Sequence, residues 1–332
     1  GEKAMRLRIL PACLPCLVLA STSPAAGAEA LRAGLIGLDT SHAGAFTAIY
    51  NDPKGPDHVP GVRVVAAFPG GSPDIPQSAD RVGPYTAELR ERWKVEIAAD
   101  IPGLCQKVDV VLLLSVDGRR HLAQAREVIQ RRKPLFIDKP MAASVAEARE
   151  IFRLAGEAKV PVFSSSALRF APGVRRARED AATGAVLGCE ALSPASIEPH
   201  HPDLFWYGIH GVESLYAVMG PGCESVVRTH TEGVDLVTGR WRDGRIGSLR
   251  GIRKGAAPFS VFVFGEKRVS RFDGESAGSI YKPLLVEIEK FFRTGASPVP
   301  AEETLELLAF MEAADASRRE GGRPVVLEPL TK

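Results

Sequence analysis

The sequence predicts an α/β fold in two parts: a doubly wound parallel sheet, followed by an α+β domain with an open, mostly antiparallel sheet. In the first half, apolar β-branched runs alternate with helical patterns. In the second half, shorter strand-like runs are separated by hairpin signals. The chain has 332 residues, which at roughly 150 residues per domain is enough for two domains.

Five strands and three helices are expected in the first half. The run at 108–114 is almost entirely apolar, which is typical of a strand buried on both faces of a sheet. The strands are expected at 33–38, 62–68, 108–114, 135–137 and 160–163, and the helices at 43–50, 122–132 and 145–158. Ligands of such sheets bind at the carboxyl ends of the strands, so the polar residues that follow the strands are the first candidates for a site.

The second half has the pattern of a mostly antiparallel sheet. A helix at 204–219, interrupted by glycine, comes first, and Asp243-Gly244 is a hairpin turn signal between two of the strand-like runs. The strands are expected at 225–227, 233–238, 246–249 and 259–264, and a last helix at 301–319 ends before a Gly-Gly pair. We place the first domain at 29–166 and the second at 167–332, with the C-terminal helix packing back.

The N-terminal residues 1–28 are predicted to be a short extension followed by a signal peptide. Arg6 and Arg8 precede the apolar run 9–20, and Ala26-Gly27-Ala28 has the form of a cleavage site. A buried helix is the alternative, but two prolines would break it, and the run is shorter than the ~20 residues of a membrane span. We therefore expect a Sec-type exported protein, periplasmic or extracellular, with no membrane partner after the signal is removed.

The composition is that of an ordinary globular chain, with 45% hydrophobic and 25% charged residues, which excludes a collagen or a disordered tail. Lys and Arg number 42 against 40 Asp and Glu, for a net charge of +2, so we expect no nucleic-acid partner. Three of the five cysteines lie after residue 28 and are widely spaced, which indicates neither a disulfide framework nor a metal site.

A glycine-containing turn joins the first strand to the first helix. Such a turn lets the backbone approach a pyrophosphate at a helix N-terminus. Only Gly37 fits the G-x-G-x-x-G pattern, because Asp39 and His42 stand at its other two glycine positions. The pattern alone is therefore compatible with a dinucleotide site or with a purely structural turn, and Asp39 adds a negative charge where phosphates would lie.

Several motifs, in this order, resemble those of the glucose–fructose oxidoreductase / inositol dehydrogenase (Gfo/Idh/MocA) family. His121 follows the third strand by a short segment, and Asp138-Lys139-Pro140 is a close variant of the Glu-Lys-Pro hallmark. Leu168 to Pro172 resembles an Arg-Phe-x-Pro element, Thr183 to Gly188 a glycine turn, and Gly208 to Glu213 a Gly-x-His-x-x-Asp element. The resemblance extends through a closing pattern at 281–322 and covers nearly all of the chain after residue 28.

The resemblance implies a Rossmann-type domain that binds NAD or NADP and a second domain that binds the substrate. It also implies hydride transfer to or from a hydroxyl of a sugar, polyol or related small molecule, with Lys139 and His210 assisting proton transfer. Burial near a cationic nicotinamide would suit the lysine for this role. The alternatives are a salt-bridged Lys139 at a strand end and a His210 that belongs only to the core.

The candidate site residues follow from these positions. The resemblance and the strand ends assign cofactor binding to Gly37, Leu38, Asp39, His42, Ser72, Ser115, His121, Asp138, Lys139 and Pro140. They assign substrate binding to Arg169, His201, Asp203, Trp206 and His210. The polar group around His201 has no metal-ligand spacing, so no metal is predicted.

Two departures from the family pattern leave a second class of function open. The second strand ends without the carboxylate that binds the adenosine ribose, while Ser72 and glycine amides there give a mild preference for NADP over NAD. Trp206 replaces a carboxylate that often lines the substrate site, and an aromatic ring there could stack on a sugar.

Export would also separate the protein from cytoplasmic nucleotides. The alternative is therefore an exported carbohydrate-binding protein or a redox-assisted glycoside-cleaving protein. Its dinucleotide site would be degenerate, or would hold a cofactor that is never exchanged. A degenerate site would leave the protein without a cofactor. By analogy with relatives of this family, a homo-oligomer is expected in either case.

Overall fold

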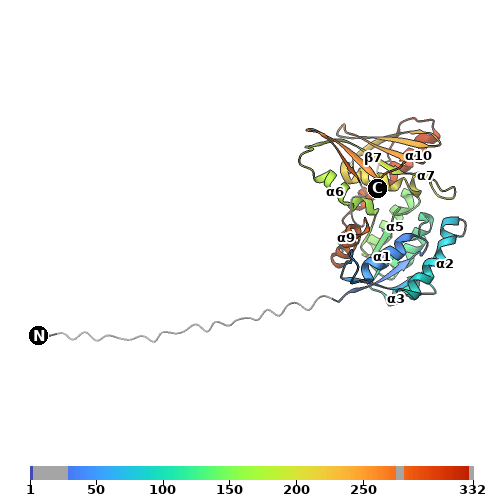
Figure 1. Cartoon of the computed structure of the whole chain (residues 1–332), viewed down its shortest axis with the longest axis vertical. Coiled ribbons are helices and arrows are strands. Elements are labelled where there is room, and N and C mark those ends of the chain that lie inside the picture. The colour runs from blue at the N-terminus through green and yellow to red at the C-terminus, as the bar shows by residue number, and fades with distance from the viewer. Residues whose placement is uncertain (3–28, 274–279, 329–332) are drawn as a thin grey trace.

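The computed structural model describes residues 1–2, 29–273 and 280–328, so the predicted signal segment lies almost entirely outside the described residues. The first half forms a six-stranded parallel sheet in the order β3-β2-β1-β4-β5-β6 (Figure 1). The strands are β1 (Leu31–Ile36), β2 (Val62–Phe68), β3 (Glu96–Ile97), β4 (Val110–Leu113), β5 (Leu135–Asp138) and β6 (Val162–Ser165). The predicted doubly wound sheet is confirmed, and its strand order reverses between β1 and β4.

Helices cover both faces of this sheet. They are α1 (Ser41–Asn51), α2 (Pro76–Glu91), α3 (Ile101–Lys107), α4 (His121–Gln130) and α5 (Val145–Ala158), with a 3-10 turn η1 (Gly118–Arg120) before α4. The sequence analysis missed α2, α3 and the edge strand β3. Helix α2 buries only Ser78 and Leu89 and contains Pro84, so it has no apolar stripe to signal it, and the other two elements are short.

A seven-stranded mixed sheet in the order β12-β11-β7-β10-β9-β8-β13 forms the second half. Its strands are β7 (Val186–Pro194), β8 (Cys223–His230), β9 (Val234–Trp241), β10 (Ile246–Ile252), β11 (Ser260–Gly265), β12 (Val269–Asp273) and β13 (Val325–Val326). Strands β7 and β10 are parallel and the other pairs antiparallel, which confirms the mostly antiparallel prediction. The sequence analysis placed only a glycine turn at 183–188, whereas the long strand β7 begins inside that segment.

The helices of the second half are α6 (Pro172–Glu179), α7 (Asp203–Trp206), α8 (Ile209–Met219), α9 (Tyr281–Thr294) and α10 (Ala301–Arg319), preceded by the 3-10 turn η2 (Ala167–Phe170). The predicted helix over 204–219, interrupted by glycine, is confirmed as two separate elements, α7 and α8, with Gly208 between them. At the break, a Cβ on Gly208 would lie 3.0 Å from the carbonyl oxygen of Leu204. All eleven residues of α8 are buried.

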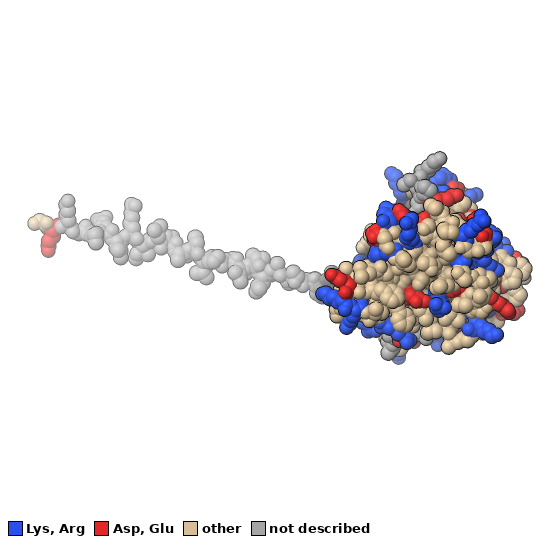
Figure 2. Space-filling model, turned by 90° about the horizontal axis from the view of Figure 1, so that it is seen from above, with Lys and Arg blue, Asp and Glu red and all other residues tan. Residues whose placement is uncertain are grey.

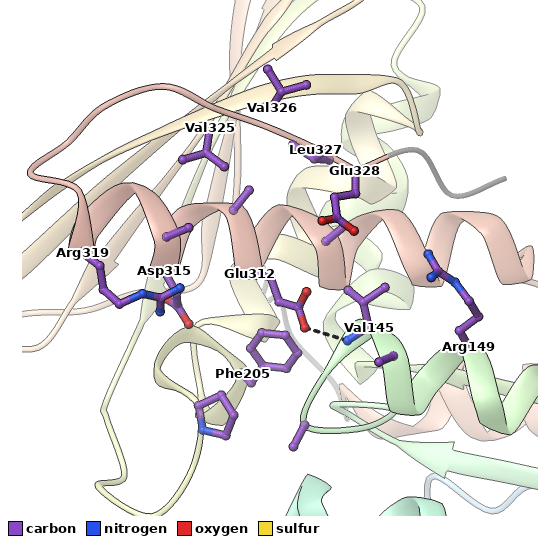
Figure 3. Close-up of a pocket in the computed structure, with 16 residues that line it drawn as sticks. Val145, Arg149, Phe205, Glu312, Asp315, Arg319, Val325, Val326, Leu327 and Glu328 are labelled. Carbon is purple, nitrogen blue, oxygen red and sulfur yellow. Dashed lines mark hydrogen bonds between the residues drawn. The ribbon is translucent and has the colours of Figure 1, made fainter. Parts of the chain in front are cut away.

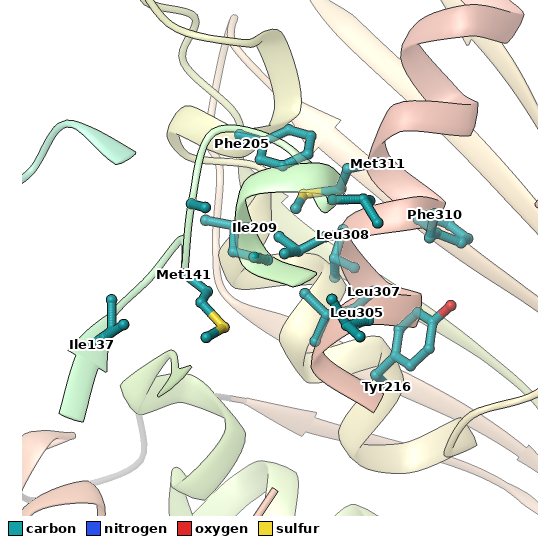
Figure 4. Packing of buried hydrophobic residues seen from close by; sticks show 14 of the residues in the cluster. Ile137, Met141, Phe205, Ile209, Tyr216, Leu305, Leu307, Leu308, Phe310 and Met311 are labelled. Carbon is teal, nitrogen blue, oxygen red and sulfur yellow. The ribbon is translucent and has the colours of Figure 1, made fainter. Parts of the chain in front are cut away.

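The hydrophobic core runs without interruption from the first sheet to the second. Figure 4 shows Met141, which follows β5, near Ile209 of α8, and Ile137 of β5 belongs to the same cluster as Leu308 and Met311 of α10. Helix α9 comes from the second half but packs beside α1 on the first sheet, where Leu285 and Phe291 share a cluster with Phe46. The carboxyl ends of the first sheet are therefore held firmly against the second half, and the site lies at this junction.

Surface and covalent features of the described residues add little to this picture. Acidic and basic side chains are interspersed over the face seen in Figure 2. Among the described helices, none combines the length and the apolar character that crossing a membrane requires. Cys105, Cys189 and Cys223 are buried free thiols.

Candidate functional site

A cavity of about 220 Å3 lies where the carboxyl ends of the first sheet meet α7 and α8. Residues from both halves of the chain line it: Thr40, Ser41, His42, Gln77, Arg81, Val116, Lys139, Ala167, Leu168, Trp206, Tyr207, His210, Phe259, Ile280 and Tyr281. Four of the predicted site residues, His42, Lys139, Trp206 and His210, are thereby brought together. The cavity is at the edge of the sheet where doubly wound folds bind their ligands.

A larger cavity of about 530 Å3 lies elsewhere, between α5, α7, α10 and β13 (Figure 3). Across it, Glu312 of α10 accepts a hydrogen bond of 2.8 Å from the backbone amide of Val145, which joins α10 to the start of α5. None of the predicted site residues lines this cavity. We therefore take the smaller cavity as the candidate active site.

Asp138 and His42 form a buried pair beside the cavity. Asp138 is the last residue of β5, and His42 lies in the first turn of α1, whose N-cap Thr40 accepts from the His42 amide. His42 Nδ1 lies 2.6 Å from Asp138 Oδ2. Burial acts to raise the pKa of Asp138, but His42 and then Lys139 bring this pKa below its ordinary value. Asp138 Oδ1 is buried and has no partner in the described structure, so it is available to a hydrogen-bond donor of a ligand.

Lys139 follows Asp138 directly and lines the cavity. Its residue is only 9% exposed, and its ammonium makes no hydrogen bond or ion pair with the residues that the structure describes. The salt-bridged lysine considered from the sequence is therefore not what this structure contains. A buried cation without a direct ion-pair partner is costly, which favours a ligand atom that carries or develops negative charge beside it.

His210 faces the same cavity from the first turn of α8. Its Nδ1 lies 2.7 Å from Ser166 Oγ, and its ring packs edge-on against Tyr207 and Phe259. Burial, followed by the nearby charges of Lys139 and His42, lowers the pKa of His210 well below its ordinary value. His210 is therefore a neutral imidazole at neutral pH, able to accept a proton from a ligand that enters the cavity.

The turn after β1 is tightly packed. Gly37 has a φ of +89°, and a Cβ there would lie 2.3 Å from the Ser115 amide nitrogen, so only glycine fits. The Leu38 amide donates to the carbonyl of Pro69, at the end of β2. Asp39 is fully buried, and its carboxylate accepts from Ser78 Oγ at 2.6 Å and from the Val116 amide at 3.1 Å.

The other predicted cofactor residues lie around this turn and are hydrogen-bonded to groups of the protein itself. Ser72 Oγ donates to Asp117 at 2.6 Å, and Ser115 Oγ donates to Gln124 at 2.9 Å. The two ring nitrogens of His121 face the backbone carbonyls of Pro140 and Ser115, at 2.9 and 2.7 Å. These groups tie together the loops after β2, β4 and β5.

A nicotinamide dinucleotide, which the family resemblance implies, fits the two ends of this region differently. The cavity end suits the nicotinamide half, because Lys139, His210, the unpaired Asp138 oxygen and the first residues of α1 meet there. Pro140 lies beside it, behind His121. At the other end the side chains of Asp39, Ser72 and Ser78 already bind one another or Asp117.

Of the predicted substrate residues, Trp206 and His210 line the cavity and His201 lies directly behind it. The His201 ring packs against Trp206 with centroids 5.3 Å apart, and its Nε2 accepts from the Gly118 amide at 3.2 Å. His201 therefore anchors the loop that carries Trp206 onto the loop after β4.

Arg169 and Asp203, also predicted as substrate residues, are not brought to this cavity. Arg169 is 9% exposed and forms ion pairs of 2.5 Å with Glu213 and with Glu303. Asp203 pairs with Arg228 and Arg318. Both residues are engaged by partners far away in the sequence, which no local motif could reveal.

Sequence reasoning missed several residues that line the cavity. Gln77 and Arg81 come from α2, which was not predicted, and Tyr281 opens α9, which was also missed. Tyr207 and Phe259 lie in segments that the sequence analysis treated as a helix and a strand without a role. Tyr207 stands next to the predicted Trp206, but no motif marked Gln77, Arg81 or Phe259 as site residues.

The pH dependence of stability offers a test of the His201 contact. Burial lowers the pKa of His201 to about 4. Unfolded histidine titrates near 6.5, so the unfolded chain binds the extra proton between these values, and stability falls as the pH drops through this window. His201 alone should cost about 3 kcal/mol by pH 4.

Urea unfolding at several pH values between 4.5 and 7.5 measures this effect. His201→Asn, whose amide oxygen can still accept from Gly118, is expected to flatten the decline. His200→Asn is the matched control, because the His200 side chain is 51% exposed, and it should leave the curve unchanged. An equally steep decline in His201→Asn would contradict the assignment.

Metal binding has no structural counterpart in this region. Within the ranges 29–273 and 280–328, no group of three or more His, Cys, Asp or Glu side chains is placed to hold a metal ion.

Comparison with solved structures shows the same two-domain fold. Myo-inositol dehydrogenase from Lactobacillus casei, solved with NAD(H) and myo-inositol, has 16% identity and a TM-score of 0.71, over 92% of this chain and 98% of its own. An oxidoreductase from Agrobacterium radiobacter, solved with NAD+, L-tartaric acid and magnesium, has 16% identity and a TM-score of 0.71, over 90% of this chain and 99% of its own.

A third neighbour, myo-inositol 2-dehydrogenase from Lactobacillus plantarum, has 16% identity and a TM-score of 0.71 over 90% of this chain and 100% of its own. A search of curated proteins finds no match. Residues 64–166 match the family model described as an oxidoreductase family with an NAD-binding Rossmann fold, GFO_IDH_MocA. This part of the first half thus matches the model of the Gfo/Idh/MocA family of oxidoreductases, the family that the motifs resemble.

Proposed function

We propose that the protein moves a hydride between a nicotinamide cofactor and a hydroxyl group of a sugar, a polyol or a related small molecule. The observation that carries this proposal is the placement of Lys139 and His210. Both residues are 9% exposed, come from different halves of the chain and line the same cavity. A buried ammonium next to a neutral imidazole is the pair needed to stabilise an alkoxide and to accept its proton.

The residues of the chain divide the work as follows. The Lys139 ammonium holds the oxygen of the substrate hydroxyl and stabilises the negative charge that develops on it. His210 Nδ1 lies 2.7 Å from Ser166 Oγ, and in the tautomer that carries its proton on Nδ1 the other ring nitrogen accepts the hydroxyl proton. When bound, the nicotinamide supplies or accepts the hydride. In the reverse direction His210 returns the proton and Lys139 polarises the carbonyl.

The walls of the cavity support a hydroxylated, ring-shaped substrate. Trp206, Tyr207 and Phe259 present aromatic surfaces, and Gln77 offers an amide that can bind hydroxyl groups. Myo-inositol and L-tartaric acid are present in two of the structural neighbours, and both carry hydroxyl groups on adjacent carbon atoms. We extend this substrate class, without choosing one member, to the present protein.

The cofactor preference and the location of the protein belong to the same proposal. Arg119 comes from the loop after β4 and donates to Asp74, just beyond Ser72, so a basic group is within this region after all. This supports the mild preference for NADP. The N-terminal signal supports export from the cytoplasm, and N-terminal sequencing of the exported protein would show whether cleavage follows Ala28. A homo-oligomer is proposed by analogy, and light scattering that finds only monomers would exclude it.

The first experiment tests turnover directly. The mature protein is mixed with NAD or NADP and a panel of sugars, inositols, other polyols and hydroxy acids, and reduced nicotinamide is followed by its absorbance. We expect turnover with at least one panel member. Binding of panel members in calorimetry without any turnover would instead favour the non-redox carbohydrate-binding alternative.

A further inference from the structure

The crevice at the reversal point of the first sheet is closed by the protein's own polar side chains. The strand order reverses between β1 and β4, and ligands of such sheets enter the crevice at this point. Here the Asp39 carboxylate spans that crevice: one oxygen accepts from the Val116 amide after β4, and the other from Ser78 of α2. Asp39 has no exposed surface.

A second set of contacts crosses beside the first. Ser72, after β2, donates to Asp117, after β4, and Asp117 in turn accepts from Arg119 at 2.8 Å. Arg119 also reaches back to Asp74 at 2.8 Å. The Ser72 amide donates to Ser78 Oγ, which links the two sets. We call Asp39, Ser72, Ser78, Asp117 and Arg119 the polar latch.

The position of Asp39 in the sequence relates the polar latch to dinucleotide binding. Asp39 stands at the second glycine of the G-x-G-x-x-G pattern, the place where a side chain is normally absent so that the pyrophosphate can approach the backbone. A carboxylate at this place competes with a phosphate for the same donors and repels it. The Ser78 hydroxyl and the Val116 amide, which could serve an anionic ligand, are both engaged by Asp39.

We propose that the Asp39 carboxylate occupies the place of a dinucleotide phosphate, so that the dinucleotide binds only when Asp39 leaves Ser78 and Val116 and the polar latch opens. The inference rests on the proposed function, since it takes a nicotinamide dinucleotide as the ligand. The nicotinamide half of the site stays accessible from the cavity, and the adenosine half is gated. The consequence is weak and slow binding of the dinucleotide by the wild-type chain.

The test measures NADH and NADPH binding by calorimetry and by stopped-flow fluorescence in three variants and the wild type. Asp39→Gly removes the carboxylate, and Ser78→Ala removes its hydroxyl donor but keeps Asp39 itself. Thr86→Val is the matched control, because the Thr86 hydroxyl lies on the same helix and bonds only the Val82 carbonyl. Thermal unfolding establishes that each variant is folded, and Ser78→Ala keeps the test decisive if Asp39→Gly does not fold.

We expect Asp39→Gly to bind the reduced dinucleotide at least about tenfold more tightly and faster than the wild type, since one hydrogen-bonded charge no longer has to be displaced. Ser78→Ala should accelerate association, and Thr86→Val should match the wild type. The inference is overturned if neither latch variant binds more tightly or faster, or if the wild type is purified saturated with nucleotide. A failure of the proposed function would differ: Asp39→Gly would bind nucleotide tightly but turn over no substrate.

Discussion

Replacing Lys139 by alanine is expected to lower kcat by about 10²–10⁴-fold, the usual range for losing a group that takes part in proton transfer. The Lys139 ammonium has no ion pair among the described residues, so its removal leaves no orphaned partner and should not destabilise the fold. The dissociation constant for the nicotinamide nucleotide should change only a few-fold, because Lys139 lines the cavity end of the site. Steady-state kinetics and calorimetry on one preparation measure both quantities.

A control at the opposite end of the same strand, β5, separates this effect from a general loss of charge. Lys133 lies just before β5 and donates to the carbonyl of Val108 at 2.8 Å, far from the cavity. Lys133→Ala should therefore keep its turnover. Full activity in Lys139→Ala would remove this residue from the mechanism, whereas an equal loss in both variants would point to a structural cause.

Replacing Arg169 by methionine is expected to lower the free energy of unfolding by about 3–5 kcal/mol, because it strands buried carboxylates. The guanidinium bridges Glu213 and Glu303, whose side chains are 4% and 11% exposed. Burial raises the pKa of Glu213 even though Arg169 lies beside it. Without the arginine, the hydrogen bond from the Ser166 amide would be left to stabilise the buried carboxylate. Urea unfolding at neutral pH measures the loss.

The neighbouring Arg175 provides the control. Arg175 pairs with Glu287 at 2.6 Å, but its side chain is 42% exposed, so Arg175→Met should cost less than about 1 kcal/mol. If Arg169→Met instead kept its stability and raised KM for the substrate, the original interpretation of Arg169 as a substrate residue would be correct. The two readouts thus distinguish a fold-stabilising arginine from a binding one.

The elements that could be predicted best from the sequence are the strands that are buried on both faces of the sheet. All four residues of β4, and likewise of β5, are buried, so β4 is an uninterrupted apolar run and β5 is apolar up to its last residue, Asp138. Helix α2 buries too few residues to show a period, and the strands at the edges of both sheets, β3 and β12, show little of the pattern of a buried strand. Local sequence therefore predicts the centre of the first sheet better than its rim.

For the site, sequence reasoning succeeds where a local motif marks the residue. Lys139 was identified through the Asp138-Lys139-Pro140 motif after a strand, and His210 through its place in the segment that resembles the Gly-x-His-x-x-Asp element. Arg169 and Asp203 looked equally like ligands, since a charged residue in a loop gives no sign of a distant partner such as Glu303 or Arg228. Pairings over long sequence separations require the fold.

The position of α9 has a consequence for the order in which the molecule is built. Leu284, Leu285 and Ile288 of this late helix are completely buried, and Phe291 packs edge-on against Phe163 at 4.6 Å. The Tyr50 hydroxyl of α1 donates to the Leu285 carbonyl. N-terminal domains usually fold while the rest of the chain is still being made. Here the first sheet lacks part of its covering layer until residues 281–294 arrive, so we expect residues 29–166 to reach their full stability only once α9 has been made.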